Sequence, residues 1–191
     1  METATEIFYP ATVQDWRAWL EQHHATATSV WVVFYKKASG MPTLTWSEAV
    51  DAALCYGWID SKKIAVDHER SQQFFSRRKP GSTWSKINKD KIEKLEAAGL
   101  MNPAGLAAVA RAKEDGSWDL LNMVDAREVP PDLAKAFRKQ RGSKAYFASL
   151  SPSAQKMLLQ WLVLAKRPET RQKRVEEIAA CAALGKKPGN F

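Results

Sequence analysis

The chain has 191 residues, of which 45% are hydrophobic and 26% are charged, a composition typical of folded rather than disordered proteins. No apolar run approaches the roughly 20 residues that a membrane-spanning helix needs, and the first ten residues do not resemble a secretory signal. The two cysteines, Cys55 and Cys181, are too few for a disulfide framework. We therefore expect a soluble, cytoplasmic protein with buried thiols.

The net charge of +8 is unevenly distributed along the chain. Residues 133–191 contain 13 Lys and Arg against 3 Asp and Glu, whereas residues 1–80 contain nine of each. Such asymmetry indicates either a polyanionic partner or a helical surface that lysine and arginine keep soluble. We favour the solvated surface and keep nucleic acid as the alternative.

The first third of the chain predicts strands and helices in alternation. Residues 7–9 predict a short strand, and Thr12 is a suitable N-cap for a helix that reaches His24. The β-branched and aromatic run of residues 30–35 predicts a second strand.

A helix and a hairpin are expected next. Thr45 and Glu48 have the spacing of a capping box, and the helix that they begin is apolar on all sides until Gly57 ends it. A hairpin follows, with its first arm around residues 64–66 and its second arm over 72–78.

The remainder of the chain reads as helical. Helices are expected at about 83–98, 102–113, 132–139, 144–150, 153–166 and 169–184. The predicted fold is α+β: a small mixed or antiparallel sheet with flanking helices over residues 1–115, a linker over 116–131, and a helical C-terminal region over 132–191 that packs onto the first domain or stands apart.

Three stretches of the sequence resemble the YdeI/OmpD-associated family, also called bacteriocin-protection proteins. They are Trp46–Ser61, Phe74–Gly105 and Ala165–Ile178. The resemblance implies a bacterial stress-response accessory protein that contributes to tolerance of bacteriocins and other antimicrobial peptides. It implies no reaction, cofactor or catalytic residue.

The best candidate for a binding site is a polar cluster after the hairpin. It consists of Arg77, Arg78, Ser82, Trp84, Ser85 and Asn88. If a helix begins at Ser82 or Thr83, its free N–H groups and the two guanidinium groups would bind a phosphate or carboxylate, and Trp84 would stack a planar ligand. The alternative is an ordinary capped helix with Trp84 in the core.

Asp60 is the second candidate, since it follows the buried helix and precedes the hairpin. It would either pair with an arginine or orient the ligand, and we favour the structural Asp–Arg pair. A small-molecule enzyme with a pocket at Asp60, Arg77 and Trp84 remains an alternative function.

The C-terminal region contains a basic cluster of Lys166, Arg167, Arg171 and Arg174. Residues 167, 171 and 174 would share one helical face, but Pro168 is expected to restart the helix. A nucleic-acid-binding module would use this face. We see no cofactor motif and no ligand spacing for a metal. The preferred function is a non-catalytic accessory protein that binds an anionic small molecule or an acidic macromolecule.

Overall fold

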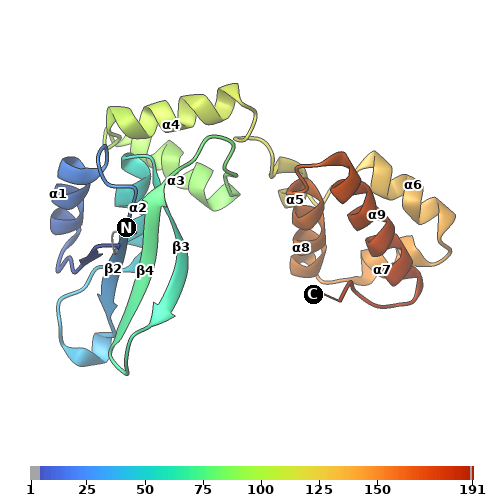
Figure 1. Cartoon of the computed structure of the whole chain (residues 1–191), viewed down its shortest axis with the longest axis horizontal. Coiled ribbons are helices and arrows are strands. Elements are labelled where there is room, and N and C mark those ends of the chain that lie inside the picture. The colour runs from blue at the N-terminus through green and yellow to red at the C-terminus, as the bar shows by residue number, and fades with distance from the viewer. Residues whose placement is uncertain (1–4, 190) are drawn as a thin grey trace. The chain divides into compact units, whose positions relative to one another are not determined.

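A computed structural model describes residues 5–189 and 191 of the chain. The chain divides into two compact units, residues 1–118 and residues 119–191 (Figure 1). Each unit has a hydrophobic core of its own.

The first unit is built on a four-stranded mixed sheet with the strand order β1-β2-β4-β3. The strands are β1 (Ile7–Phe8), β2 (Ser29–Tyr35), β3 (Trp58–Ala65) and β4 (Arg70–Arg77). β1 runs parallel to β2, and the other neighbours are antiparallel. Together with the helices that follow, this sheet confirms the predicted α+β class.

The register places the apolar residues of three strands on one face of the sheet. Phe75 lies opposite Val30 on one side and opposite Asp60 on the other, and Trp58 lies opposite Arg77. Residues that lie opposite each other point to the same face. Val30, Phe75 and Trp58 are accordingly all fully buried beneath the helices.

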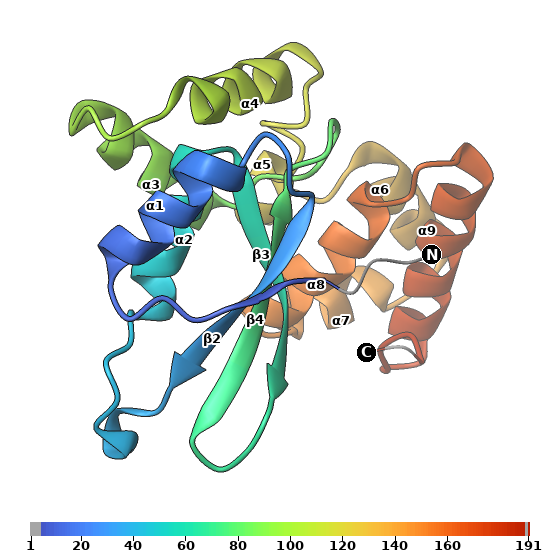
Figure 2. The same cartoon turned by 60° about the vertical axis from the view of Figure 1, so that its left-hand side comes forward.

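Helices α1 (Val13–His23) and α2 (Trp46–Cys55) pack against this face of the sheet, and two further helices, α3 (Lys86–Ala97) and α4 (Pro103–Glu114), pack on α2 (Figure 2). A short 3-10 turn, η1 (Lys37–Ser39), follows β2. Thr12 and Thr45 form the capping boxes that begin α1 and α2. Trp16 of α1 packs 5.4 Å from Phe75 of β4, measured between ring centroids.

Helix α3 begins three residues later than the sequence suggested. Ser85 is its N-cap and accepts a hydrogen bond from the backbone N–H of Asn88. The expected start at Ser82 or Thr83 is wrong, because the backbone N–H of Ser82 bonds to the carbonyl of Lys79 and closes a turn instead.

The two ends of the sheet carry different connections. Helix α4 lies at the end where β3 begins and β4 finishes (Figure 1). The β3–β4 hairpin and the loop after β2 lie at the other end.

The second unit is helical throughout its regular structure. Its helices are α5 (Asn122–Asp125), α6 (Pro131–Lys139), α7 (Ser143–Ser149), α8 (Pro152–Val163) and α9 (Pro168–Ala183). Proline is the first residue of α6, α8 and α9, where its missing N–H costs no helical hydrogen bond. Leu133, Leu162 and Ile178 are at the centre of the second core.

The segment 116–131, expected as a linker, contains α5. Its residues Leu121 and Val124 are buried in the second core. Among the described residues, no helix combines the length and the apolar character that crossing a bilayer would require.

Candidate anion-binding site

Two arginines are positioned where β4 ends. Arg77 is the last residue of the strand, and its backbone N–H donates to the carbonyl of Thr28. Arg78 follows the strand, and its N–H donates to the carbonyl of Gly57 at 2.9 Å. These bonds fix the backbone of Arg77 to the residue before β2 and that of Arg78 to the residue before β3.

A close approach of α4 brings a third arginine to this place. A Cβ atom on Gly105 would lie 2.2 Å from the carbonyl oxygen of Cys55, and one on Gly57 would lie 3.0 Å from the Cβ of Ala108. Only glycine allows the backbones to come this near. Because residues four and seven positions apart share a helical face, Arg111 projects from the face of α4 that Ala104 and Ala108 pack with.

The three arginines line one cleft with a volume of about 260 Å³, which we call the arginine cleft. His24, Ala25, Tyr56, Gly57 and three alanines of α4 also line it, and none of the described residues that line it is an aspartate or a glutamate. A concave surface lined by guanidinium groups without carboxylates has a positive potential and attracts anions.

Arg78 is the most unusual of the three, because it is charged and only 8% exposed. Its guanidinium lies 3.6 Å from the ring centre of Trp84, and Nη1 donates to the carbonyl of Thr83 at 3.0 Å. Its Nε and Nη2 have no hydrogen-bond partner among the described residues.

Burial lowers the pKa of Arg78 to about 10, and the charge of Asp60 partly opposes this shift. Arg78 therefore stays protonated at neutral pH. Buried donors without partners typically cost about 1 to 3 kcal/mol each, more when they are charged, so negative charge placed in the cleft beside this guanidinium would be favoured.

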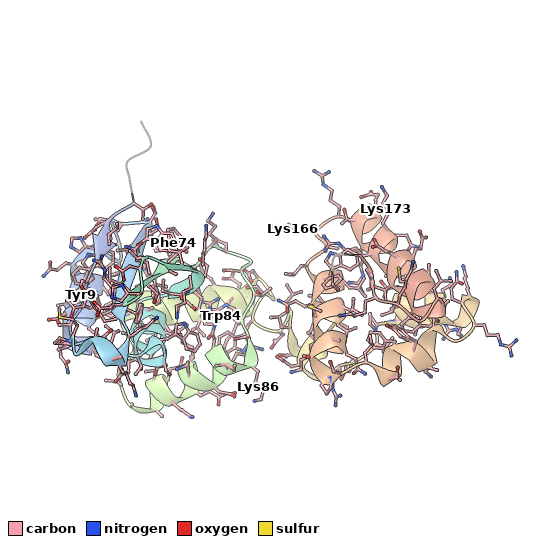
Figure 3. The ribbon with its side chains drawn as sticks, turned by 90° about the horizontal axis from the view of Figure 1, so that it is seen from below. Tyr9, Phe74, Trp84, Lys86, Lys166 and Lys173 are labelled. Carbon is pink, nitrogen blue, oxygen red and sulfur yellow. The ribbon has the colours of Figure 1, made fainter. Side chains whose placement is uncertain are left out.

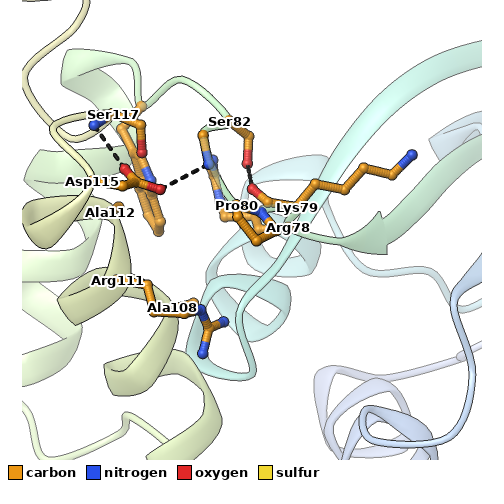
Figure 4. A pocket seen from close by; sticks show the side chains of 11 residues that line it. Arg78, Lys79, Pro80, Ser82, Ala108, Arg111, Ala112, Asp115 and Ser117 are labelled. Carbon is orange, nitrogen blue, oxygen red and sulfur yellow. Dashed lines mark hydrogen bonds between the residues drawn. The ribbon is translucent and has the colours of Figure 1, made fainter.

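A second, smaller pocket shares Arg78, Ala108 and Arg111 with the arginine cleft and is bounded by a tight turn (Figure 4). Asp115 accepts hydrogen bonds from the backbone N–H groups of Gly81 and Ser117, both at 2.9 Å. The bonds from Ser117, followed by the bond from Gly81, lower the pKa of Asp115. The space between this turn and Arg78 measures only about 10 Å³, room for about one water molecule.

The structure separates the members of the predicted cluster. Arg77 and Arg78 line the arginine cleft, whereas Ser85 and Asn88 form the cap of α3. The hydroxyl of Ser82 donates to the carbonyl of Lys79 within the turn. Trp84 is 2% exposed and lies against Arg78, so its ring supports the guanidinium rather than a ligand.

Asp60 forms no ion pair with an arginine among the described residues, although its charge acts on Arg78. Its Oδ2 accepts hydrogen bonds from Nε1 of Trp46 at 2.9 Å and from Nε2 of Gln73 at 3.2 Å. Asp60 does not line the arginine cleft, and Arg77 donates instead to the carbonyl of Ala25. Arg77 lines the arginine cleft and Trp84 lines the smaller pocket beside Arg78, and Asp60 lines neither of these two.

The basic cluster of the second unit is largely used for packing. Arg171 donates to both oxygens of Asp132, at 2.6 and 3.1 Å, and Arg174 donates to the carbonyl of Trp161 while lying over its ring. The backbone of Arg167 is extended, because Arg167 is the N-cap of α9, which begins at Pro168. Lys166 is exposed on the outside of the unit (Figure 3).

Sequence reasoning missed Arg111, which lies 33 residues after Arg78 along the chain. The available signal was the spacing of Ala104, Ala108 and Arg111, which predicts a helix face of small residues that ends in a cation. The packing of that face on Gly57, which the sequence does not show, places Arg111 beside Arg77 and Arg78.

These features define an α+β domain with a basic cleft, followed by a helical unit. Residues 8–108 match a domain of unknown function, DUF8412, and the chain belongs to this family. Residues 126–185 match the family described as bacteriocin-protection, YdeI or OmpD-associated, which confirms the suspected resemblance for this part of the chain.

The two matches divide the three stretches that suggested the resemblance. Ala165–Ile178 lies within the bacteriocin-protection match, whereas Trp46–Ser61 and Phe74–Gly105 lie within the range of the other family. No curated protein and no solved structure matches the chain.

Proposed function

We propose that the chain is a non-catalytic accessory protein of bacteriocin protection that binds an anionic group in the arginine cleft. The match of residues 126–185 to the bacteriocin-protection family supports the accessory role. The single observation that supports anion binding is the convergence of Arg77, Arg78 and Arg111 on one cleft without a lining carboxylate.

The chemistry of the cleft favours binding over catalysis. Its imidazole, that of His24, has Nδ1 2.8 Å from the carbonyl oxygen of Leu20, and its phenol, that of Tyr56, donates to Glu21 at 2.8 Å. Burial, followed by the bond to Glu21, raises the pKa of Tyr56. Among the described residues, neither group is hydrogen-bonded to a side chain that could act as a nucleophile, so the cleft offers no nucleophile–base pair for covalent catalysis.

The volume of the cleft and the paired N–H donors of each guanidinium group indicate which ligands would fit. A volume of about 260 Å³ is just below the range of roughly 300 to 1,000 Å³ that is common for small-molecule sites. Guanidinium groups bind phosphate and carboxylate through paired hydrogen bonds. The favoured ligand is a small phosphate or carboxylate, or such a group on a larger acidic partner.

A thermal-shift experiment tests this proposal. Wild type would be heated with inorganic phosphate, pyrophosphate and a series of dicarboxylates, beside Arg111→Gln and the control Arg138→Gln. Arg138 is an exposed arginine of α6 outside the cleft. A ligand at 100 times its Kd stabilises the folded state by about 2.7 kcal/mol, which raises the unfolding temperature by several degrees.

We expect at least one anion to stabilise wild type and Arg138→Gln but not Arg111→Gln. Equal stabilisation of all three would mean that the anion binds elsewhere, and the proposal would be abandoned. Cells that depend on this chain for survival in the presence of a bacteriocin would then link the site to the role: Arg111→Gln is expected to reduce survival, and Arg138→Gln is not.

A further inference from the structure

A second and larger cavity lies at the opposite end of the sheet from the arginine cleft. Its walls come from the end of β2, the β3–β4 hairpin, and the loop that leads into α2, and its volume is about 590 Å³. We call it the hairpin pocket. Within the described part of the chain, this pocket and the arginine cleft share no lining residue.

The hairpin pocket contains an exposed indole that is held in place. Trp46, the first residue of α2, is 48% exposed, although its Nε1 donates to Asp60 at 2.9 Å. Gln73, which is 4% exposed, donates to the same carboxylate oxygen and to the carbonyl of Ser61. The indole is therefore anchored at its edge while about half of its surface remains open. A ring that is already fixed loses little entropy when a second ring stacks on it.

Cations surround this indole. Lys36, Lys37, Lys63 and Arg70 line the pocket together with one acidic residue, Asp67. Arg70 and Asp67 neutralise each other in an ion pair of 2.7 Å across the hairpin turn. The three lysines form no ion pair among the described residues, so the pocket keeps a positive charge.

We propose that the hairpin pocket binds a nucleoside phosphate, with the base stacked on Trp46 and the phosphate contacted by the lysines. A bare anion would leave the open indole unused, and an uncharged ring would leave the lysines unused. The volume lies within the roughly 300 to 1,000 Å³ of small-molecule sites, and a cationic groove beside an aromatic platform is how proteins hold unpaired nucleotides. The ligand is either a free nucleotide or the end of a single strand.

Isothermal titration calorimetry of the full chain tests this assignment. The probes are a nucleoside, its 5′-monophosphate, inorganic phosphate, and a six-nucleotide single strand. All variants would also contain Arg111→Gln, so that binding in the arginine cleft does not contribute and failure of that proposal stays separate. Trp46→Leu removes the stacking surface, Trp46→Phe retains a ring, and Lys63→Ala removes a cation from the exposed hairpin. Lys94→Ala, an exposed lysine of α3, is the control.

The expected result is that the monophosphate binds more tightly than either the nucleoside or phosphate. Trp46→Leu should weaken it roughly tenfold or more, Trp46→Phe less, and Lys94→Ala not at all. Lys63→Ala should weaken binding and reduce its dependence on salt. A strand that binds more tightly than the monophosphate identifies single strands as the source, and equal affinities identify the free nucleotide. If the monophosphate binds no better than phosphate, or binds the protein with Trp46→Leu as tightly as the protein with Arg111→Gln alone, the assignment is wrong.

Discussion

The sharpest test of the site's architecture is the substitution Gly105→Ala. Gly105 is in the first turn of α4, and its place in a helix makes alanine the better residue by about 0.8 to 1.0 kcal/mol of intrinsic propensity. The added Cβ would lie 2.2 Å from the carbonyl oxygen of Cys55 and 2.9 Å from that of Leu54. Both atoms are backbone and cannot rotate away as a flexible side chain would.

The magnitude follows from the two opposing effects. Inserting a methyl group into a closely packed region costs typically about 1 to 3 kcal/mol, and contact with rigid backbone favours the upper end. After the gain in propensity is subtracted, a net loss of about 2 kcal/mol remains. For a unit of this size, that loss lowers the unfolding temperature by roughly 5 to 10 °C.

Intrinsic fluorescence is the suitable assay, because seven of the eight tryptophans precede residue 119 and therefore report on the first unit. Ala110→Gly, at an exposed position of α4, measures the propensity effect alone and should cost about 1 kcal/mol. If Gly105→Ala were as stable as wild type or more stable, the close approach of α4 would not exist, and the placement of Arg111 in the cleft would lose its basis.

Three further predictions address individual contacts. Arg78→Met keeps a chain of similar length against Trp84 but removes the buried charge, so without ligand the unfolding temperature should be unchanged or higher, while stabilisation by anions should be lost. The hydrogen bond from Arg70, followed by that from Glu69 N–H, lowers the pKa of Asp67 to about 2; the resulting small stabilisation is present above the unfolded pKa and is lost as the pH falls through 2. An NMR titration of the Asp67 carboxyl group should have its midpoint there, and Arg70→Gln should move the midpoint toward 3.8. Arg171→Gln should destabilise the second unit by about 1 kcal/mol in urea denaturation followed by circular dichroism, whereas the exposed Lys173→Gln should have no effect; the reverse order would contradict the packing role of Arg171.

Local sequence signals predicted most of the regular structure. The capping residues Thr12 and Thr45 begin the helices for which they were proposed, the helix expected at 102–113 has Asn102 as its cap, and Pro168 begins the last helix. These signals are reliable because a cap satisfies backbone groups within three residues of itself. The start of α3 was misplaced because Ser82, Thr83 and Ser85 are all acceptable caps, and the neighbouring turn decides between them.

The candidate site was only partly predictable. Arg77 and Arg78 were identified from their position after the hairpin, but Arg111 comes from a helix whose approach depends on two glycines. Asp60 was assigned an arginine partner because both lie near the sheet, whereas the strand register and a bulge next to Asp60 place Trp46 and Gln73 beside it. Contacts between distant segments follow from register and helix packing, which a single sequence does not specify.

The separate cores of the two units also bear on how such a chain evolves. Trp16, Trp58 and Phe75 belong to the first core, and all three lie within the residues that match DUF8412. Leu133, Leu162 and Ile178 belong to the second core and lie within the bacteriocin-protection match. A change in one core does not need a compensating change in the other. Each half can therefore drift, be duplicated or be joined to a new neighbour at its own pace, which is the physical condition for recombination of domains.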